Sequence, residues 1–427
     1  MHQWVFVTIV SVTLICTVTF LIIYTPFYVV QHEPSDPYAV ARRVLKTAPL
    51  VDGHNGFPNN LHRILENRIQ NTDFRQNLTE DPIWGMKSCP TCHSDIVRLK
   101  EGIMGTQLWA VGCNCETEFK DAVEQTMEQI DVMYRFIDMY PDVFQYAGSA
   151  ADIEYARYDG KIGAMFRIEG GHTIDNRLSV LRNYYKLGVR AMTLSFDCNT
   201  PWVESSGINE EVKADPDKNS TGLSDFGLLV IEEMNRLGMI IDLTHSSLQT
   251  QMDVFNHSRA PVIFSHSNAY ALCDNHRNVR DEVLHLVRDH GGLVMVNFDA
   301  SSVNCSEEAT IAEVADQINH IRNVSGVDHV GIGSLFDTTN RTVTGLEDVS
   351  KFIELFAYLA DESDENYPEW TEIELQKLAG RNFLNVFKAV EAVSAKMRGE
   401  GKLPVEEWIA VEDLTNHTEC ITLMDEL

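Results

Sequence analysis

Two short apolar runs that each end on a histidine constrain this chain more than any other feature. Residues 239–245 end at His245, and residues 261–266 end at His266. Apolar, β-branched runs of this length predict buried strands rather than helices. Residues 249–259 are long enough for the helical crossover that parallel strands require. We therefore expect both imidazoles at the carboxyl ends of adjacent parallel strands, where barrel enzymes place their chemistry.

Two further apolar runs end on side chains that bind metals, one at His54 and the other at Glu169. Three neutral imidazoles and one carboxylate suit a zinc shell. A glutamate that offers one oxygen to each of two ions can also bridge a pair of metals. The alternative is that His245, His266 and Glu169 are buried structural side chains that hold no metal.

Eight candidate strands recur along the chain, near residues 50, 107, 165, 191, 241, 263, 295 and 330. Helical patterns separate most of them, and their polar ends would share one rim. This order predicts an α/β fold, a (β/α)₈ TIM-type barrel of the kind found in metal-dependent hydrolases. The predicted domains are a membrane segment or signal peptide at 1–31, a linker and first helix at 32–49, the barrel at 50–398 and an acidic C-terminal tail at 399–427.

Several connections between the strands can also be predicted. An irregular inserted loop at about 59–99 is expected to pass over the barrel mouth. Residues 226–237 form a helix with Ser224 or Asp225 as its cap. Helices at 347–360 and 371–397 close the fold. A helix at 120–140 is expected to bury one apolar stripe, made of Val123, Met127, Ile130, Tyr134 and Ile137.

The N-terminal residues predict entry into the secretory pathway. Residues 4–30 contain no Asp, Glu, Lys or Arg and are long enough to cross a bilayer. We expect an uncleaved membrane anchor, with a cleaved signal peptide as the alternative, and in both cases an extracellular or lumenal barrel. The chain also carries N-glycosylation sequons, at Asn77, Asn219, Asn256, Asn304, Asn323, Asn340 and Asn416. A net charge of −29 argues against nucleic acid as a partner.

The chain has nine cysteines, of which Cys16 lies in the predicted membrane segment. In an oxidising compartment the other eight predict disulfides. Cys89 and Cys92 form a C-x-x-C pair, which in a cytosolic protein would suggest zinc binding or redox activity. In this compartment a local disulfide within the inserted loop is the favoured interpretation.

A set of long motifs in fixed order resembles one known family, the membrane (renal-type) dipeptidases, which are secreted or surface zinc peptidases built on this barrel. The likeness extends over roughly residues 36–420. Its motifs are residues 51–55, 167–171, 198–202, 237–245, 261–270, 277–279 and 345–350.

The resemblance implies a site with two zinc ions that hydrolyses dipeptides. His54 and a carboxylate two positions later would hold one ion, Glu169 would bridge, and His245 and His266 would hold the other. Water activated between the ions would attack the peptide carbonyl. Arg277 matches the residue that grips the carboxylate of the substrate.

The resemblance also implies a disulfide pattern and a partner. Disulfides would join Cys115 to Cys198 and Cys273 to Cys305. Cys420 matches a cysteine that links two chains into a homodimer. The remaining cysteines, Cys89, Cys92 and Cys113, are extra, and we expect two of them to pair locally.

Three positions depart from the family pattern. The second carboxylate ligand is replaced by Gly56, an imidazole on the fourth strand by Phe196, and the catalytic aspartate after the eighth strand by Leu335. One lost transition-state donor costs about a hundred- to a thousandfold in rate, and one lost general acid or base about a hundred- to ten-thousandfold.

We therefore predict an impaired or inactive dipeptidase-fold protein. One zinc ion would be held by Glu169, His245 and His266, with a weakened second site, and a dipeptide-like small molecule would be its ligand. The alternative is an active zinc dipeptidase that uses one metal or has altered specificity, with a carboxylate such as Asp337 recruited to the site.

Overall fold

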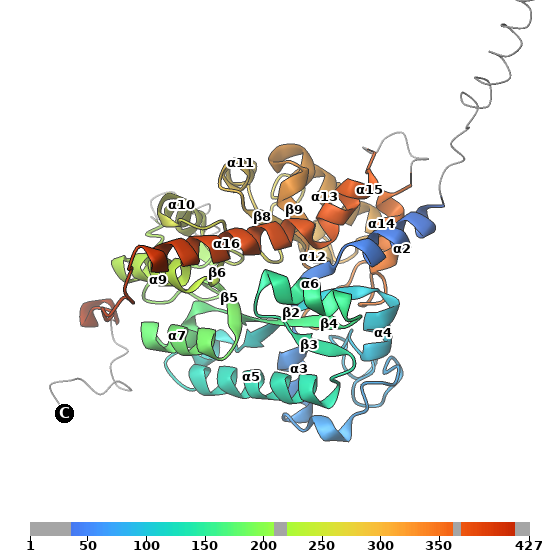
Figure 1. Cartoon of the computed structure of the whole chain (residues 1–427), viewed down its shortest axis with the longest axis horizontal. Helices are drawn as coiled ribbons and strands as arrows, with labels where there is room; N and C mark the ends of the chain where they lie inside the picture. Colours follow the sequence, from blue (N-terminus) through green and yellow to red (C-terminus); the bar gives the residue numbers. More distant parts are fainter. Residues whose placement is uncertain (1–35, 209–219, 362–368, 415–427) are drawn as a thin grey trace, which may run out of the picture.

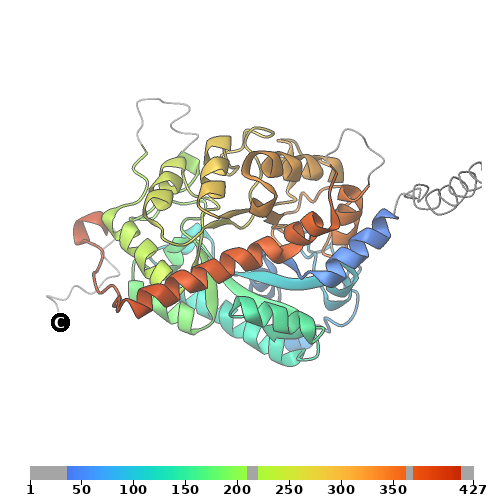
Figure 2. The same cartoon turned by 45° about the horizontal axis from the view of Figure 1, so that its top comes forward.

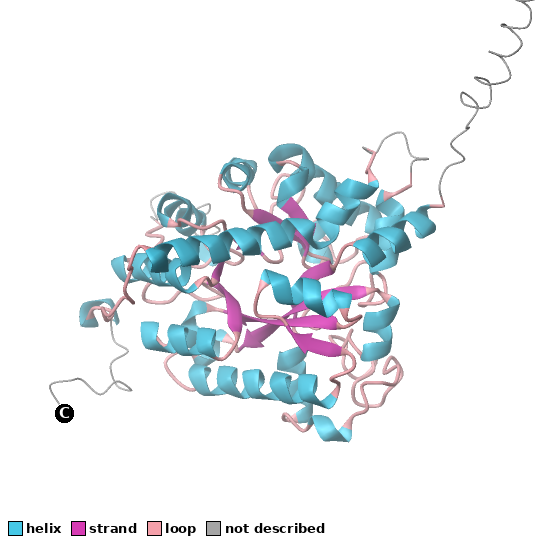
Figure 3. Cartoon of the chain, in the orientation of Figure 1, coloured by secondary structure: helices cyan, strands magenta, loops and turns pink. Residues whose placement is uncertain are grey.

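A closed barrel of eight parallel strands forms the centre of the protein (Figure 3). The computed structural model describes residues 36–208, 220–361 and 369–414. The strands follow one another around the barrel in sequence order, and the last pairs with the first, at Asp52 and Ile332. They are β1 (Leu50–Asn55), β2 (Met104–Gly112), β4 (Ile162–Glu169), β5 (Val189–Thr193), β6 (Ile240–Asp242), β7 (Ile263–Phe264), β8 (Leu293–Val296) and β9 (Val330–Ile332). The predicted (β/α)₈ barrel is confirmed.

Helices surround the barrel on the outside (Figure 1). They are α2 (Pro37–Thr47), α3 (Phe57–Leu65), α4 (Ile96–Glu101), α5 (Ala122–Met139), α6 (Ala150–Tyr158), α7 (Leu178–Lys186), α9 (Asp225–Leu237), α10 (Leu248–His257), α11 (Asp281–Asp289), α12 (Ala300–Val303), α13 (Ile311–Ser325), α14 (Phe352–Leu359), α15 (Glu372–Gln376) and α16 (Asn382–Gly399). Ser224 is the cap of α9, since its side chain accepts from the N–H of Gly227.

The predicted membrane segment, residues 1–31, lies outside the described residues. Within the part of the chain that the structure describes, no helix has the length and apolar character needed to cross a bilayer.

The long helix α16 closes one end of the barrel and leaves the other end free for the site. It runs across the strands in Figures 1 and 2. Its Phe383 and Phe387 join one buried cluster with Ile240, Ile263 and Leu293, the first residues of three barrel strands. This end of the barrel is therefore a packed core. Burial of each such side chain stabilises the fold by about 1.5–3 kcal/mol. The carboxyl ends of the strands lie opposite.

The inserted region at 59–99 is more ordered than predicted. It contains most of α3 and the start of α4, and its Trp84 is fully buried. The side chain of Arg98 pairs with Asp95 at 2.7 Å and with Asp348 at 3.2 Å, which ties the insertion to the segment before α14. A disulfide joins Cys89 to Cys92 within it.

The structure also differs from the predicted strands, helices and C-terminal tail. Short strand β3 (Phe144–Tyr146) pairs with the start of β4 and was not predicted. The helix predicted at 371–397 is two helices, because residues Lys377–Arg381 form a π-helical turn with Gly380 outside helical geometry. Helix α14 begins at Phe352, later than predicted. The expected tail also packs on the barrel as far as Leu414, and Val405 is buried where its carbonyl accepts from Arg182.

The predicted apolar stripe of α5 is only partly right. Ile130 and Ile137 are buried, but Met127 is 49% exposed. The helix instead buries Gln129, whose Oε1 accepts a hydrogen bond from the backbone N–H of Gly112 at 3.0 Å. A buried amide that satisfies the end of a neighbouring strand cannot be found from apolar periodicity.

Candidate metal centre

Four side chains from four strand ends converge at the open end of the barrel. His54 Nε2 lies 2.9 Å from Glu169 Oε1 and 3.1 Å from Glu169 Oε2. His266 Nε2 lies 3.5 Å from Glu169 Oε1. His245 Nε2 lies 3.8 Å from the same oxygen and 3.1 Å from His266 Nε2. The structure thus brings together all four side chains that were predicted as metal ligands.

The separations between these donor atoms fit a zinc ion. Zinc–nitrogen and zinc–oxygen bonds are about 2.0–2.1 Å long, so neighbouring ligand atoms around a tetrahedral ion are about 3.3 Å apart. The separations among Glu169, His245 and His266 are 3.1, 3.5 and 3.8 Å. His54, Glu169 and His266 form an overlapping set, with all ligand atoms within 4.8 Å of one another. Either set supplies two imidazoles and one carboxylate.

The charge states of two of these groups suit metal binding. Burial lowers the pKa of His266 well below its usual value, so its imidazole is neutral at pH 7. Burial alone would raise the pKa of Glu169, but His54 and the guanidinium of Arg167 lower it below its usual range. Arg167 Nη1 lies 3.4 Å from Glu169 Oε1. The carboxylate is therefore ionised.

A buried aspartate that the sequence analysis missed holds two of the histidine-bearing turns. Asp242 Oδ1 accepts hydrogen bonds from the backbone N–H groups of Thr244 at 3.1 Å and Ser265 at 3.0 Å. These two residues directly precede the two histidines. Asp242 Oδ2 accepts from Arg167 Nη2 at 2.8 Å, and both of these side chains are fully buried. Asp242 is thus a positioning residue for the centre.

Asp52 has the same role beside His54. Its Oδ1 accepts from the backbone N–H of Ser334 at 2.7 Å, and its Oδ2 accepts from the hydroxyl of Ser334 at 2.7 Å. Its Oδ2 also accepts from Gln107 Nε2 at 2.9 Å. One carboxylate therefore joins β1, β2 and the turn after β9. The signal in the sequence was a carboxylate inside an apolar strand. Asp52 in β1 lies two residues before His54, and Asp242 at the end of β6 lies three residues before His245.

Further groups orient the two histidines that follow β6 and β7. His245 adopts a left-handed backbone conformation, with φ of 69°. Its Nδ1 lies 3.2 Å from Asp197 Oδ1. His266 Nδ1 lies 2.8 Å from the hydroxyl of Ser265. Such partners fix the ring orientation of metal-binding histidines, and in both rings they leave Nε2 facing the centre.

The three positions that depart from the family pattern surround this centre without supplying a polar side chain. The Phe196 ring lies with its centroid 4.9 Å from that of His245. Leu335 is buried, with φ of 65°. A Cβ atom at Gly56 would lie only 2.2 Å from Thr338 Oγ1. The loop after β9 therefore occupies the space into which a side chain at position 56 would extend.

The carboxylate of Asp337 is already engaged elsewhere. Its Oδ2 accepts a hydrogen bond from the Ser94 hydroxyl, and its Oδ1 accepts one from the His93 backbone N–H at 3.2 Å. Burial raises its pKa to about 6. Asn55 is engaged in the same cluster, since its Nδ2 donates to Ser94 Oγ at 3.0 Å. The hydrogen bonds from Asp337 and Asn55 to residues 93 and 94 hold the inserted loop against the barrel.

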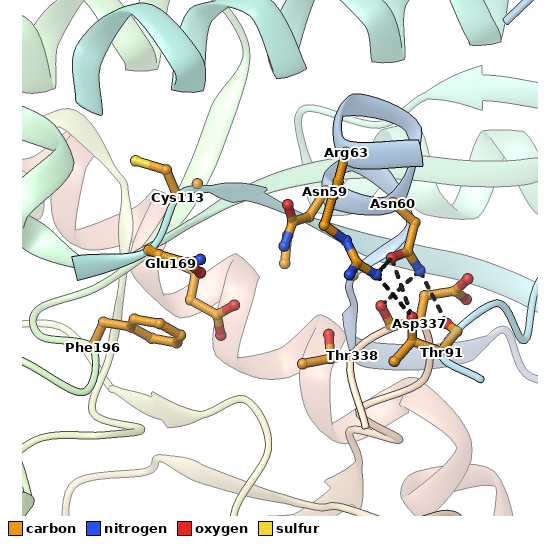
Figure 4. A pocket seen from close by; sticks show the side chains of 13 residues that line it. Asn59, Asn60, Arg63, Thr91, Cys113, Glu169, Phe196, Asp337 and Thr338 are labelled. Atoms are coloured by element: carbon orange, nitrogen blue, oxygen red, sulfur yellow. Dashed lines mark hydrogen bonds between the residues drawn. The ribbon is translucent and has the colours of Figure 1, made fainter. Parts of the chain in front are cut away.

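Two cavities open beside the centre and share Glu169, Phe196 and Thr338 as lining residues. The first, of about 290 Å³, lies between Glu169 and helix α3 and is called here the α3 cavity (Figure 4). The second, of about 200 Å³, is lined by His245, His266 and Arg277 and is called the Arg277 cavity. The two cavities therefore adjoin at Glu169, one of the four metal-binding side chains.

The Arg277 cavity is lined by two arginines, Arg277 and Arg341, and by three carboxylates, Glu169, Asp197 and Asp299. Asp299 Oδ2 lies 3.2 Å from Arg341 Nη2 and 3.9 Å from Arg277 Nη2. Asp299 is buried, and it also accepts a hydrogen bond from the Ser301 backbone N–H. Asp299 thus lies between the two guanidinium groups and closer to Arg341, while Asp197 lies beside His245. Arg341 was missed because nothing in its local sequence marks it.

The structure contains the two long-range disulfides that the resemblance implies, Cys115 to Cys198 and Cys273 to Cys305. The first follows β2 and β5 and fixes the loop that carries Phe196. Cys113 is a free cysteine. Cys420 lies outside the described residues.

Comparisons with known proteins agree with this geometry. The family model described as membrane dipeptidase (peptidase family M19) matches residues 38–401. Dipeptidase 3 of Mus musculus is 38% identical over 366 residues, which cover 86% of this chain and 69% of that protein. Dipeptidase 3 of Homo sapiens is also 38% identical over 366 residues, with 86% and 70% coverage.

Solved structures are similar as well. A metallopeptidase from Rhodobacter sphaeroides, liganded with a phosphinate mimic of the dipeptide L-Ala-D-Ala, has a TM-score of 0.66 and 25% identity, covering 80% of this chain and 99% of that one. A probable dipeptidase from Pseudomonas aeruginosa has the same fold, with a TM-score of 0.69 at 20% identity, covering 84% of this chain and 100% of that one. The chain therefore belongs to the membrane dipeptidase family, peptidase family M19.

Proposed function

We propose that this protein binds one zinc ion and a dipeptide-like ligand, and that it hydrolyses dipeptides poorly or not at all. The observation that carries the proposal is the composition of the pocket wall. Phe196 and Leu335 line the Arg277 cavity, and Gly56 lines the α3 cavity. No one of these three side chains can bind a metal, donate to an oxyanion or move a proton.

The proposed zinc ligands are Glu169, His245 and His266. This donor set is of the His₂Glu kind, which holds catalytic zinc in other peptidases. A bound zinc would polarise a carbonyl and lower the pKa of a water molecule. His54 would then bond Glu169 and hold its carboxylate in place. The second zinc site would be weak, because only His54 and the shared Glu169 remain for it.

The proposed ligand places its C-terminal carboxylate in the Arg277 cavity. Arg277 can form two parallel hydrogen bonds to a carboxylate, which adds geometric specificity. Asp299 limits this attraction, because its own carboxylate lies 3.9 Å from the same guanidinium. Asp299 pairs mainly with Arg341, because its Oδ2 lies 3.2 Å from Arg341 Nη2. Because Asp299 lies closer to Arg341 and Asp197 lies beside His245, the guanidinium of Arg277 keeps donors for a ligand carboxylate.

The alternative function is that of an active dipeptidase that recruits Asp337 in place of the missing aspartate. Two observations weigh against it. Both carboxylate oxygens of Asp337 accept hydrogen bonds from residues 93 and 94. Its backbone N–H also bonds His93 Nδ1 at 3.0 Å. Moving this carboxylate to the centre would break the contact between the barrel and the inserted loop.

The decisive test measures zinc content and turnover on the full-length protein. We expect close to one zinc per chain, loss of that zinc in Glu169→Gln, and turnover of a dipeptide panel no more than about a thousandth of the roughly 10 s⁻¹ typical of enzymes. Two zinc ions per chain would refute the one-zinc proposal, and efficient turnover abolished by His245→Ala would establish the active alternative.

We further propose a membrane-anchored homodimer linked through Cys420, with the barrel outside the cytoplasm and glycosylated. The disulfides among the described residues support an oxidising compartment. We expect the full-length chain to migrate as a dimer on a gel without reductant and as a monomer after reduction or after Cys420→Ser. Migration as a monomer without reductant would show that Cys420 forms no such link.

A further inference from the structure

The α3 cavity is lined by a positively charged side chain, Arg63, that has no role in the proposed function. Arg63 lies on α3 and lines this cavity together with Asn59, Asn60 and Thr91. In Figure 4 these residues stand on the opposite side of the cavity from Glu169 and Phe196. The wall facing the metal-binding side chains is therefore polar and carries a positive charge.

The guanidinium of Arg63 has spare hydrogen-bonding capacity. Its Nη2 donates to Asn60 Oδ1 at 3.2 Å and to Thr91 Oγ1 at 3.4 Å. These are neutral acceptors, and among the described residues no carboxylate lies within ion-pair distance of Arg63. Two neutral bonds hold the head group over the cavity and leave its charge without a counter-ion. An arginine held in this way can bind a carboxylate with two donors.

Neither of the two acidic side chains that line this cavity, Asp337 and Glu169, forms an ion pair with Arg63. Asp337 lines the cavity, but its oxygens accept from Ser94 and from the His93 backbone. Glu169 lies at the far wall and faces three histidines and Arg167.

We propose that the α3 cavity is an anion subsite, in which Arg63 binds a carboxylate on the N-terminal residue of a dipeptide-like ligand. This inference rests on the proposed function, since the other end of the ligand is taken to lie at Arg277. A ligand that spans both cavities would carry two carboxylates, one at each arginine, with its peptide group beside Glu169. Acidic dipeptides and N-acylated amino acids with an acidic acyl group have this form.

Gly56 contributes to this subsite because it has no side chain. It lines the α3 cavity next to Thr338, and a Cβ atom added there would lie 2.6 Å from the Asp337 carbonyl oxygen. The glycine that removes a metal ligand therefore also lets the loop after β9 pack closely beside this subsite.

The test compares two dipeptides that differ only in one charge. We would titrate the zinc-loaded, full-length protein calorimetrically with Glu-Ala and with Gln-Ala, which has nearly the same shape. We expect Glu-Ala to bind about fivefold to tenfold more tightly, as for a charge-assisted bond at a partly exposed site. Arg63→Gln should abolish this difference and Arg63→Lys should keep part of it. Arg68→Gln, which changes an arginine just beyond α3 that pairs with Glu66, should leave it intact.

Two further variants separate the outcomes. Arg63→Glu should reverse the preference, so that Lys-Ala binds more tightly than Glu-Ala, with an unchanged thermal unfolding midpoint showing that α3 is still folded. Equal binding of Glu-Ala and Gln-Ala, together with loss of both in Arg277→Gln, would refute the anion subsite and leave the proposed function standing. Failure of every dipeptide to bind the zinc-loaded protein would refute both.

Discussion

The double variant Phe196→His and Leu335→Asp is expected to turn over Ala-Ala at least about a thousandfold faster than the natural chain. A restored donor and a restored acid or base are each worth at least about a hundredfold, and non-additivity reduces their product. Both positions line the Arg277 cavity beside Glu169 and His245. Leu335 has φ of 65°, a backbone conformation that aspartate tolerates better than leucine.

Zinc content and kcat with added zinc are the measurements that check this result. The matched control is Phe196→Gln with Leu335→Asn, which restores polar side chains of similar size that cannot move a proton. We expect that control to keep one zinc and to gain far less activity. If the histidine and aspartate variant folds, binds zinc and still fails to turn over Ala-Ala, the cause of inactivity lies outside these two positions.

The third departure cannot be reversed by one substitution. An aspartate at position 56 would place its Cβ 2.2 Å from Thr338 Oγ1 and 2.6 Å from the Asp337 carbonyl oxygen. The second of these atoms belongs to the backbone and cannot move away by rotating. Gly56→Asp alone should therefore not raise the zinc content to two ions. Gain of a second zinc requires the loop after β9 to move, for which Thr338→Gly provides part of the room.

The side chains of the site that could be predicted are those that directly follow one predicted strand. His54, Glu169, His245 and His266 each follow an apolar run, and the carboxyl ends of parallel strands in a barrel meet on one rim. Their convergence follows from topology alone. Their hydrogen-bond partners do not, because Ser334 reaches Asp52 across 282 positions of the chain.

The parts that could not be predicted depend on close approaches between distant segments. Buried polar side chains such as Gln129 and Asp52 were passed over, because burial is expected of apolar residues and these are buried only for their hydrogen bonds. The closeness of Thr338 to Gly56 is likewise invisible in the sequence. An inserted segment with few apolar repeats was expected to be irregular, although its Trp84 is buried in the main core against Phe57 and Phe74.

Removal of the Asp242 carboxylate is expected to have the largest effect on stability. Asp242 and Arg167 are both 0% exposed and are 2.8 Å apart. Removing Asp242 would leave the buried Arg167 with only its longer contact to Glu169 at 3.4 Å, and breaking a buried pair costs about 3–5 kcal/mol. Asp242→Ala would also free the N–H groups of Thr244 and Ser265, which hold the turns before His245 and His266. We expect a lower denaturant midpoint and weaker zinc binding together.

Two further variants distinguish the buried charge from the lost hydrogen bonds. Asp242→Asn keeps an oxygen acceptor for the two backbone N–H groups but removes the charge that faces Arg167. We expect it to lose most of the stability and to retain more zinc affinity than Asp242→Ala. The double variant Arg167→Met and Asp242→Leu removes both charges and should be more stable than Asp242→Ala. If Asp242→Ala lowers the free energy of unfolding by less than about 1 kcal/mol, the pair does not hold this end of the barrel.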